Sequence, residues 1–241
     1  MTMSQLELIH DGKEKKVYAT ENPDIVLIHY NDLVTAFGGI KRAVIKGKGI
    51  CNNHISAIIF KELAKAGIPN HFISLENDRE MLCRRIESIP IQIIVRNRLA
   101  GTTARMLGVP NGTRIPNTVF ELRYNCDELS DPMINEHHAV ALGLVSYEDI
   151  EFMMDLARRT NETLQALYHR AGIELVDFKM ECGRAGDGSI IVSDEVSPDN
   201  SRLWDEKTGA VLDKDRFRHD LSDVTANYKE VQDRLTAVSK I

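Results

Sequence analysis

Two acidic side chains flank the Asp187-Gly188 dipeptide with the spacing of a metal site. Asp-Gly is a strong two-residue hairpin turn, and folding the chain there pairs the residues on either side of it. Glu181 and Asp194 then lie directly opposite one another on the two predicted strands. Facing side chains of a sheet lie about 5 Å apart, where two carboxylates repel unless a cation lies between them. Carboxylate oxygens suit Mg²⁺, which usually completes its shell with water and substrate phosphates, so the pair predicts nucleotide chemistry.

The same residues allow two other arrangements. The carboxylates can splay into water, or the pairing can slip by one residue, which moves one of them to the opposite face. Alternation along the first predicted strand places Asp177, Lys179 and Glu181 on one face and apolar side chains on the other. A polar face of this kind is either exposed to solvent or part of an active site. The acid-rich segment 193–205, which contains the only tryptophan, follows the second strand and favours an active site.

Two further segments have the composition of anion-binding loops. Residues 12–16 (GKEKK) connect two predicted strands, and a glycine backbone with lysine ammonium groups can cover phosphates. The same composition is also typical of a solvated charged turn. Residues 96–103 leave a strand with Arg96 and Arg98, followed by small and hydroxyl side chains. Guanidinium forks and hydroxyl groups together suit a phosphate or a carboxylate.

The composition limits the class of protein. The chain has 241 residues, 43% hydrophobic and 27% charged, which is typical of one large globular domain or two lobes. Its formal charge of −6 argues against broad binding to nucleic acid or a membrane surface, whereas an anionic small molecule can still bind a local cluster of Lys and Arg. The four cysteines form no CxxC pair, so neither a zinc site nor a disulfide framework is indicated. Without a signal peptide or a long apolar run, the chain is expected in the cytoplasm.

Residue patterns predict an α+β fold of two lobes. The predicted strands lie at 6–10, 16–20, 25–30, 72–74, 81–85, 91–96 and 174–182. The predicted helices lie at 50–66, from Ser146 to Ala171, and at 223–238. Ser146 and Asp149 form the start of the second helix as a capping box. The division predicted from this order is an antiparallel N-terminal lobe at 1–85 and a C-terminal lobe at 86–241.

The ordered set of motifs resembles the SAICAR synthetases (phosphoribosylaminoimidazole-succinocarboxamide synthases) of purine biosynthesis. No single motif decides this, but together they cover nearly the whole chain. The matching stretches are GKEKKVY at 12–18, NNHIS at 52–56, AGIPN at 66–70, VRNRLAGT at 95–102, DPMINE at 131–136, LVDFKMECG at 175–183, SDEVSPDNSRLWD at 193–205 and DKDRFR at 213–218.

The resemblance implies an ATP-dependent ligase. Such an enzyme joins L-aspartate to the carboxylate of carboxyaminoimidazole ribonucleotide (CAIR) and gives SAICAR, ADP and phosphate. ATP first converts the unreactive carboxylate into an acyl phosphate, which the aspartate amine attacks. The family fold has two α+β lobes, the first similar to a protein-kinase N-lobe and the second to part of an ATP-grasp domain. Family members also suggest a homodimer or a larger homo-oligomer.

The nucleotide residues of the family fall on five positions. Lys13, Glu14 and Lys15 correspond to the loop over the ATP phosphates. Glu181 and Asp194 correspond to the ligands of Mg²⁺ and the nucleotide, in agreement with the hairpin argument.

The substrate residues fall on five others. Arg96, Thr102 and Arg202 correspond to the Arg, Ser and Arg that bind the phosphate of CAIR, with Thr102 keeping the hydroxyl group. Lys179 and Asp177 share a face with Glu181. We expect these two to meet the reacting carboxylate or the aspartate.

Asn125 departs from the family pattern. Many relatives have a lysine at this position, where it contacts the nucleotide. In this chain the positive charge either comes from Arg123 or is absent.

Two other functions would use the same nucleotide site. A kinase-like phosphotransferase would need an HRD-type catalytic loop and a DFG metal motif, and the sequence contains neither. A nucleotide sensor would bind ATP without releasing ADP when CAIR and aspartate are present.

Overall fold

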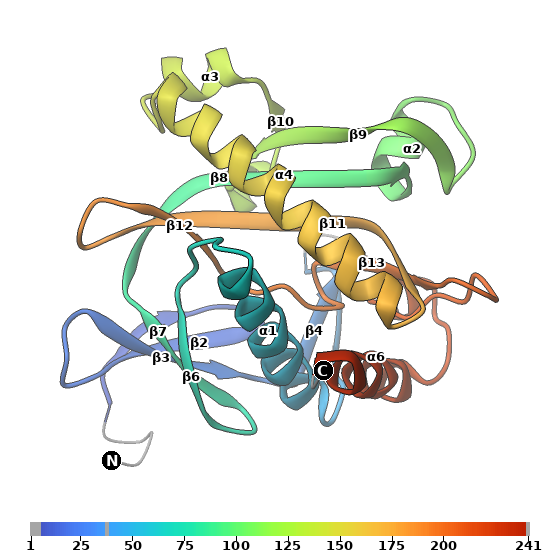
Figure 1. Cartoon of the computed structure of the whole chain (residues 1–241), viewed down its shortest axis with the longest axis horizontal. Coiled ribbons are helices and arrows are strands. Elements are labelled where there is room, and N and C mark those ends of the chain that lie inside the picture. Colours follow the sequence, from blue (N-terminus) through green and yellow to red (C-terminus); the bar gives the residue numbers. More distant parts are fainter. Residues whose placement is uncertain (1–5, 37–38, 240–241) are drawn as a thin grey trace.

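The computed structural model describes residues 6–36 and 39–239, which form antiparallel sheets covered by helices (Figure 1). The first sheet has the strand order β1-β2-β3-β7-β6. Its strands are β1 (Leu8–Asp11), β2 (Lys15–Ala19), β3 (Ile25–Tyr30), β6 (Phe72–Asn77) and β7 (Glu80–Arg84). A separate hairpin, β4 (Leu33–Ala36) with β5 (Lys41–Val44), follows β3. The predicted meander of the first three strands is confirmed.

The second sheet has the strand order β10-β9-β8-β11-β12, and β13 also pairs with β11. Its strands are β8 (Ile86–Leu99), β9 (Thr113–Tyr124), β10 (Met133–Ile134), β11 (Ile173–Ala185), β12 (Ile190–Ser193) and β13 (Ser201–Asp205). β13 pairs with the first half of β11 and β12 with the second half. The acidic loop 194–200 therefore crosses the middle of β11, beside its polar face.

Three long helices pack against these sheets, α1 (Lys48–Lys65), α4 (Tyr147–Arg170) and α6 (Val224–Ser239). Short helices are α2 (Gly101–Met106), α3 (Glu136–Ala141) and α5 (Asp215–Arg218). α4 runs across one face of the second sheet (Figure 1). α1 joins the two sheets, because Ile55 and Ile59 belong to the core of the second sheet and Ala57 to the core of the first. Within the described residues, no helix combines the length and apolar character needed to cross a membrane.

The local signals for α4 are confirmed. Ser146 Oγ accepts a hydrogen bond from the backbone N–H of Asp149 at 3.1 Å. The backbone N–H of Ser146 in turn donates to Asp149 Oδ2 at 3.2 Å. This capping box satisfies two N–H groups that the helix leaves free. Gly172 ends the helix with φ of 67°, a left-handed conformation that glycine adopts without a steric penalty.

The predicted register of the β11–β12 hairpin is wrong by one residue. Glu181 pairs with Ser193, not with Asp194. The loop has three residues rather than two, since the Ala185 N–H donates to the Ser189 carbonyl at 2.9 Å. Gly188 takes the left-handed position, with φ of 82°, that a three-residue hairpin loop requires.

The chain passes from the first sheet to the second at Arg85, between β7 and β8. The mixed α+β class is confirmed, and the division at residue 85 into two domains stays a prediction. The sequence patterns missed β9, which carries Pro116 and has little apolar alternation. Proline weakens a strand signal but is tolerated at a sheet edge, where no neighbouring strand needs its N–H. β10 pairs with β9 only at Leu122 and Arg123, so Pro116 lies on an edge without this neighbour.

His71 is a polar residue buried between the sheets. Its ring packs edge-on against Phe60 at 5.0 Å between centroids, and its backbone N–H donates to the Val192 carbonyl at 3.0 Å. The Nε2 atom is buried and has no hydrogen-bond partner among the described residues. Burial, with a smaller contribution from the Lys15 ammonium group, lowers the pKa of His71 from 6.5 to about 4.

We expect His71 to make the protein less stable in acid. The folded-state pKa is below the unfolded value, so the free energy of unfolding falls as the pH decreases from 6.5 towards 4. In His71→Gln this part of the decrease, up to about 3 kcal/mol, is lost. Urea unfolding at several pH values measures the effect, with the exposed His169→Gln as control. Parallel pH curves for the wild type and His71→Gln would show that His71 has no such role.

Candidate active site

A cavity of about 1230 Å³ lies between the β1–β2 loop and the polar face of the second sheet. Such a volume accommodates a nucleotide together with a second small ligand. Every site residue predicted from the sequence lines this cavity: Lys13, Glu14, Lys15, Arg96, Thr102, Asp177, Lys179, Glu181, Asp194 and Arg202. Residues from distant parts of the chain therefore meet at one place.

Glu181 and Asp194 share a lysine despite the change of register. Lys179 lies two residues before Glu181 on β11, so both side chains point to the same face. Lys179 Nζ contacts Glu181 Oε1 and lies 3.7 Å from Asp194 Oδ2. Asp194 follows the last residue of β12 and has φ of 66°, so this turn, not the strand alternation, sets its direction. Lys15 of β2 contacts its other oxygen, Oδ1.

Burial and charge act together on these groups. Burial raises the pKa of Glu181, and the neighbouring Asp194 carboxylate raises it further. Burial also opposes the charge on Asp194, but the Lys15 and Lys179 ammonium groups outweigh it and hold the pKa of Asp194 below its usual range. The pKa of Lys179 is raised, because the two carboxylates outweigh the effect of its burial. The cluster therefore contains two ammonium groups, those of Lys15 and Lys179, and two carboxylates, those of Glu181 and Asp194.

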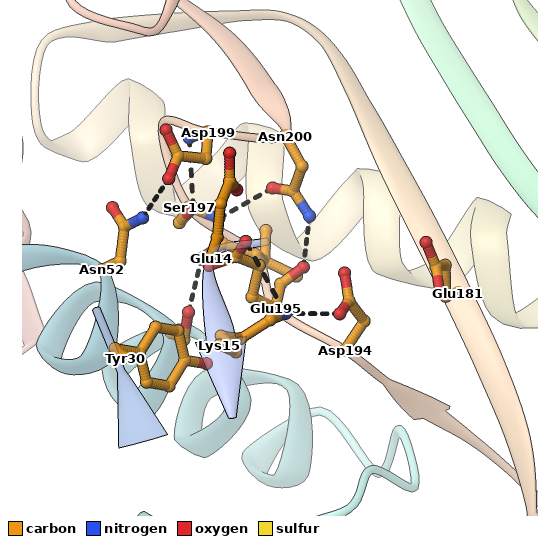
Figure 2. Close-up of polar contacts among 12 residues, drawn as sticks. Glu14, Lys15, Tyr30, Asn52, Glu181, Asp194, Glu195, Ser197, Asp199 and Asn200 are labelled. Carbon is orange, nitrogen blue, oxygen red and sulfur yellow. Dashed lines mark hydrogen bonds and ion pairs between the residues drawn. The ribbon is translucent and has the colours of Figure 1, made fainter. Parts of the chain in front are cut away.

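A second group of acids lies beside the first. Glu14, Glu195 and Asp199 each offer a carboxylate oxygen within 4.8 Å of the others, and Figure 2 shows them with Asp194. Burial raises the pKa of Glu195 to about 7, and its Oε2 has no hydrogen-bond partner among the described residues. Each acid also faces a lysine: Lys214 is 2.6 Å from Glu14, Lys15 is 3.6 Å from Glu195 and Lys48 is 2.5 Å from Asp199.

Asp199 is held by three side chains from two helices. Besides Lys48 of α1, Asn52 of the same helix donates to Asp199 Oδ2 at 2.5 Å. Tyr228 of α6 donates its hydroxyl to Oδ1 at 2.7 Å. Burial opposes ionisation, but Lys48 and Lys214 hold the pKa of Asp199 below its usual range. This network fixes the loop 194–200 against both helices.

The donor set of Glu181 and Asp194 fits Mg²⁺. Both are carboxylates that line the cavity wall, which is the ligand type that Mg²⁺ prefers. Each carboxylate oxygen can accept more than one contact, so the lysine contacts leave acceptor positions on both groups. Glu14, Glu195 and Asp199 are also oxygen donors beside lysines, so their chemistry fits a divalent cation as well.

The β1–β2 loop makes ion pairs with three segments on the other side of the cavity. Its pairs are Lys13 with Asp127 at 2.6 Å, Glu14 with Lys214 at 2.6 Å, and Lys15 with Asp194. A Cβ atom at Gly12 would lie 2.9 Å from the Lys15 carbonyl oxygen, so the tight turn requires glycine there. The predicted phosphate loop thus closes over the cavity rather than extending into solvent.

Asp177 joins the two predicted substrate arginines. Arg96 Nη1 donates to Asp177 Oδ2 at 2.8 Å, and Arg202 Nη1 donates to the same oxygen at 2.9 Å. Arg96 also forms a bidentate pair with Glu121, at 2.6 and 3.0 Å. A Cβ atom at Gly101 would overlap the Arg202 guanidinium group, so glycine permits the close approach of the segment that carries Thr102.

Sequence reasoning missed several residues that line the cavity. Glu195 and Asp199 lie in the quoted SDEVSPDNSRLWD motif, and Lys214 lies in DKDRFR, but none of them was given a role. The signal for Glu195 and Asp199 was the acidic composition of the motif at 193–205. Arg123 contacts Glu121 at 3.4 Å and the Asp131 carbonyl at 3.2 Å, and among the described residues it makes no hydrogen bond or ion pair with Glu181.

Comparisons with known proteins agree with these motifs. A sequence model described as SAICAR synthetase matches residues 8–235. The chain is 50% identical over 233 residues to phosphoribosylaminoimidazole-succinocarboxamide synthase of Dichelobacter nodosus, covering 97% of this chain and 98% of the relative. It is 46% identical over 234 residues to the protein of the same name from Clostridium beijerinckii, covering 97% and 100%.

Solved structures share the fold. The crystal structure of phosphoribosylaminoimidazole-succinocarboxamide synthase from Ehrlichia chaffeensis has a TM-score of 0.94 and 41% identity, covering 96% of this chain and 99% of that one. A SAICAR synthetase (Type-2) in complex with ADP has a TM-score of 0.92 and 40% identity, covering 95% and 97%. Together with the family match over nearly the whole chain, these identities show that the chain belongs to the SAICAR synthetase family.

Proposed function

We propose that this cavity carries out the ligation for which the family is known, in which L-aspartate is joined to the carboxylate of CAIR at the expense of ATP. The chain is accordingly an ATP-dependent ligase of purine biosynthesis. The observation that carries the assignment to this cavity is that all the predicted site residues line it.

The reaction needs two steps on the same carboxylate group. A carboxylate oxygen of CAIR attacks the γ-phosphorus of ATP, and the bond to ADP breaks. The amine nitrogen of L-aspartate then attacks the acyl carbon, the bond to the phosphate oxygen breaks, and the amine loses a proton. The cavity must therefore hold three anionic molecules close together, which explains its many cationic side chains.

Residues of the β1–β2 loop and of β11 serve the nucleotide in this proposal. Lys13 and Lys15 bind its phosphates, and Glu14 holds the loop through Lys214. Glu181 and Asp194 hold Mg²⁺, which supplies charge neutralisation at the phosphate oxygens when bound. Support comes from the half-buried, charge-balanced contacts of both carboxylates with the lysines.

The opposite end of the cavity serves CAIR and L-aspartate. We assign the CAIR phosphate to Arg96, Thr102 and Arg202, since Asp177 holds both guanidinium groups in place. Lys179 and Asp177 lie between this end and the nucleotide residues on β11, so they meet the reacting carboxylate or the aspartate.

The organisation around the cavity is also a proposal. The first sheet corresponds to a lobe similar to a protein-kinase N-lobe, and the second to part of an ATP-grasp domain. The change of sheet at Arg85 and the loop over the cavity support this division. The homodimer or larger assembly and the cytoplasmic location stay predictions.

Phosphate release tests the function directly. We expect release from ATP and Mg²⁺ only when CAIR and L-aspartate are both present, with one SAICAR formed per phosphate. L-Glutamate should react at least about tenfold more slowly, because its extra methylene misplaces the amine. ATP binding without phosphate release would indicate a sensor, and a phosphorylated hydroxyl without an amide product would indicate a phosphotransferase.

Glu181→Ala and Asp194→Ala test the metal assignment. Each variant removes one of the two proposed ligands, so we expect turnover to fall at least about 100-fold. The rate of SAICAR formation measures this, and thermal unfolding checks that the variants fold. Glu87→Ala is the matched control, since Glu87 is an exposed carboxylate on β8 outside the cavity lining. Near-normal rates in both site variants would contradict the assignment.

A further inference from the structure

Asn125 contacts the proposed metal ligand Glu181 directly. Its Nδ2 donates a hydrogen bond to Glu181 Oε2 at 3.2 Å. The backbone N–H of Asn125 donates to the Pro90 carbonyl at 3.0 Å, which fixes the residue beside β8 just after the end of β9. The side chain therefore reaches Glu181 of β11 across β8, from the segment that follows β9.

Gln92 sets the orientation of the Asn125 amide. Gln92 lies directly across from Glu181 in the β8–β11 register and is 6% exposed. Its Nε2 donates to Asn125 Oδ1 at 2.8 Å. Because an amide has a donor end and an acceptor end, this contact turns the Asn125 NH₂ group towards Glu181. The result is a chain of hydrogen bonds from Gln92 through Asn125 to Glu181.

Both oxygens of Glu181 are thus held, but by groups of different charge. Lys179 contacts Oε1 as a cation, and Asn125 contacts Oε2 as a neutral donor. A lysine at position 125 would place a further ammonium group beside Glu181, Asp194 and their two lysine partners. That added charge would repel a divalent cation and attract a phosphate.

We propose that Asn125, oriented by Gln92, is a positioning residue that fixes Glu181 and keeps this end of the cavity neutral enough to bind Mg²⁺ tightly. The inference rests on the proposed role of Glu181 in metal binding.

The test is the binding of ADP by calorimetry over a series of Mg²⁺ concentrations. Asn125→Ala should raise the Mg²⁺ concentration that gives half of the maximal gain in ADP affinity, by roughly three- to tenfold, the effect of one lost hydrogen bond. Asn125→Lys should raise it further and should also tighten ADP binding in the absence of Mg²⁺. A purely structural role would not move these two quantities in opposite directions.

Gln92→Ala tests the orienting contact. Because Gln92 acts through Asn125, the double variant Gln92→Ala/Asn125→Ala should need no more Mg²⁺ than Asn125→Ala alone. The matched control is Asn97→Ala, on the same strand, whose amide bonds to Asn161 at 2.9 Å outside the cavity lining. This control should lower the midpoint of thermal unfolding without changing the Mg²⁺ requirement.

The outcomes separate this inference from the ligase assignment. An unchanged Mg²⁺ requirement in Asn125→Ala and Asn125→Lys, both folded, overturns the inference even if the wild type makes SAICAR. An ADP affinity of the wild type that ignores Mg²⁺ also overturns it. The expected shifts in a protein that fails the phosphate-release test would support the inference and remove the ligase assignment.

Discussion

The half-buried contacts of Lys15 with Asp194, and of Lys179 with both Glu181 and Asp194, are the interactions on which the cavity depends. Lys15 comes from the first sheet, whereas Lys179 and Glu181 come from the second, so the charges join two separately built walls. Removing one member would leave a half-buried charge without its partner, which destabilises a protein more than the loss of a fully exposed pair. The same ion pairs keep polar side chains in the cavity between the two sheets.

A second buried network gives the acidic loop its shape. Lys48 and Asn52 reach Asp199 from α1, and Tyr228 reaches it from α6. The carboxylate of Asp199 is satisfied at both oxygens, and such a buried polar network stabilises a single arrangement of the backbone. The C-terminal helix, which touches no ligand position itself, thereby helps to hold the loop that carries Asp194.

The sequence predicted elements whose signals are local and missed those that depend on partners. The capping box and Gly172 located α4, because helix ends are determined by neighbouring residues. β9 carries Pro116 and depends on pairing with β8, so its own residues indicated little. The motifs predicted side chains that the fold brings to one cavity. The contact of Asn125 with Glu181 could not be predicted, since it joins the residue after β9 to β11 across β8. The predicted hairpin was wrong only in the length of its loop. Glycines lie on both sides of Asp187, so the sequence allows a loop of two or of three residues.

The ion pairs of the β1–β2 loop differ in their exposure to water, so they differ in their sensitivity to dissolved salt. The side chains of Lys13 and Asp127 are 45% and 72% exposed, whereas those of Lys214 and Glu14 are only 9% and 15% exposed. Dissolved salt screens an exposed pair strongly and a sheltered pair weakly. Rising ionic strength therefore weakens the contact between Lys13 and Asp127 before the contact between Glu14 and Lys214.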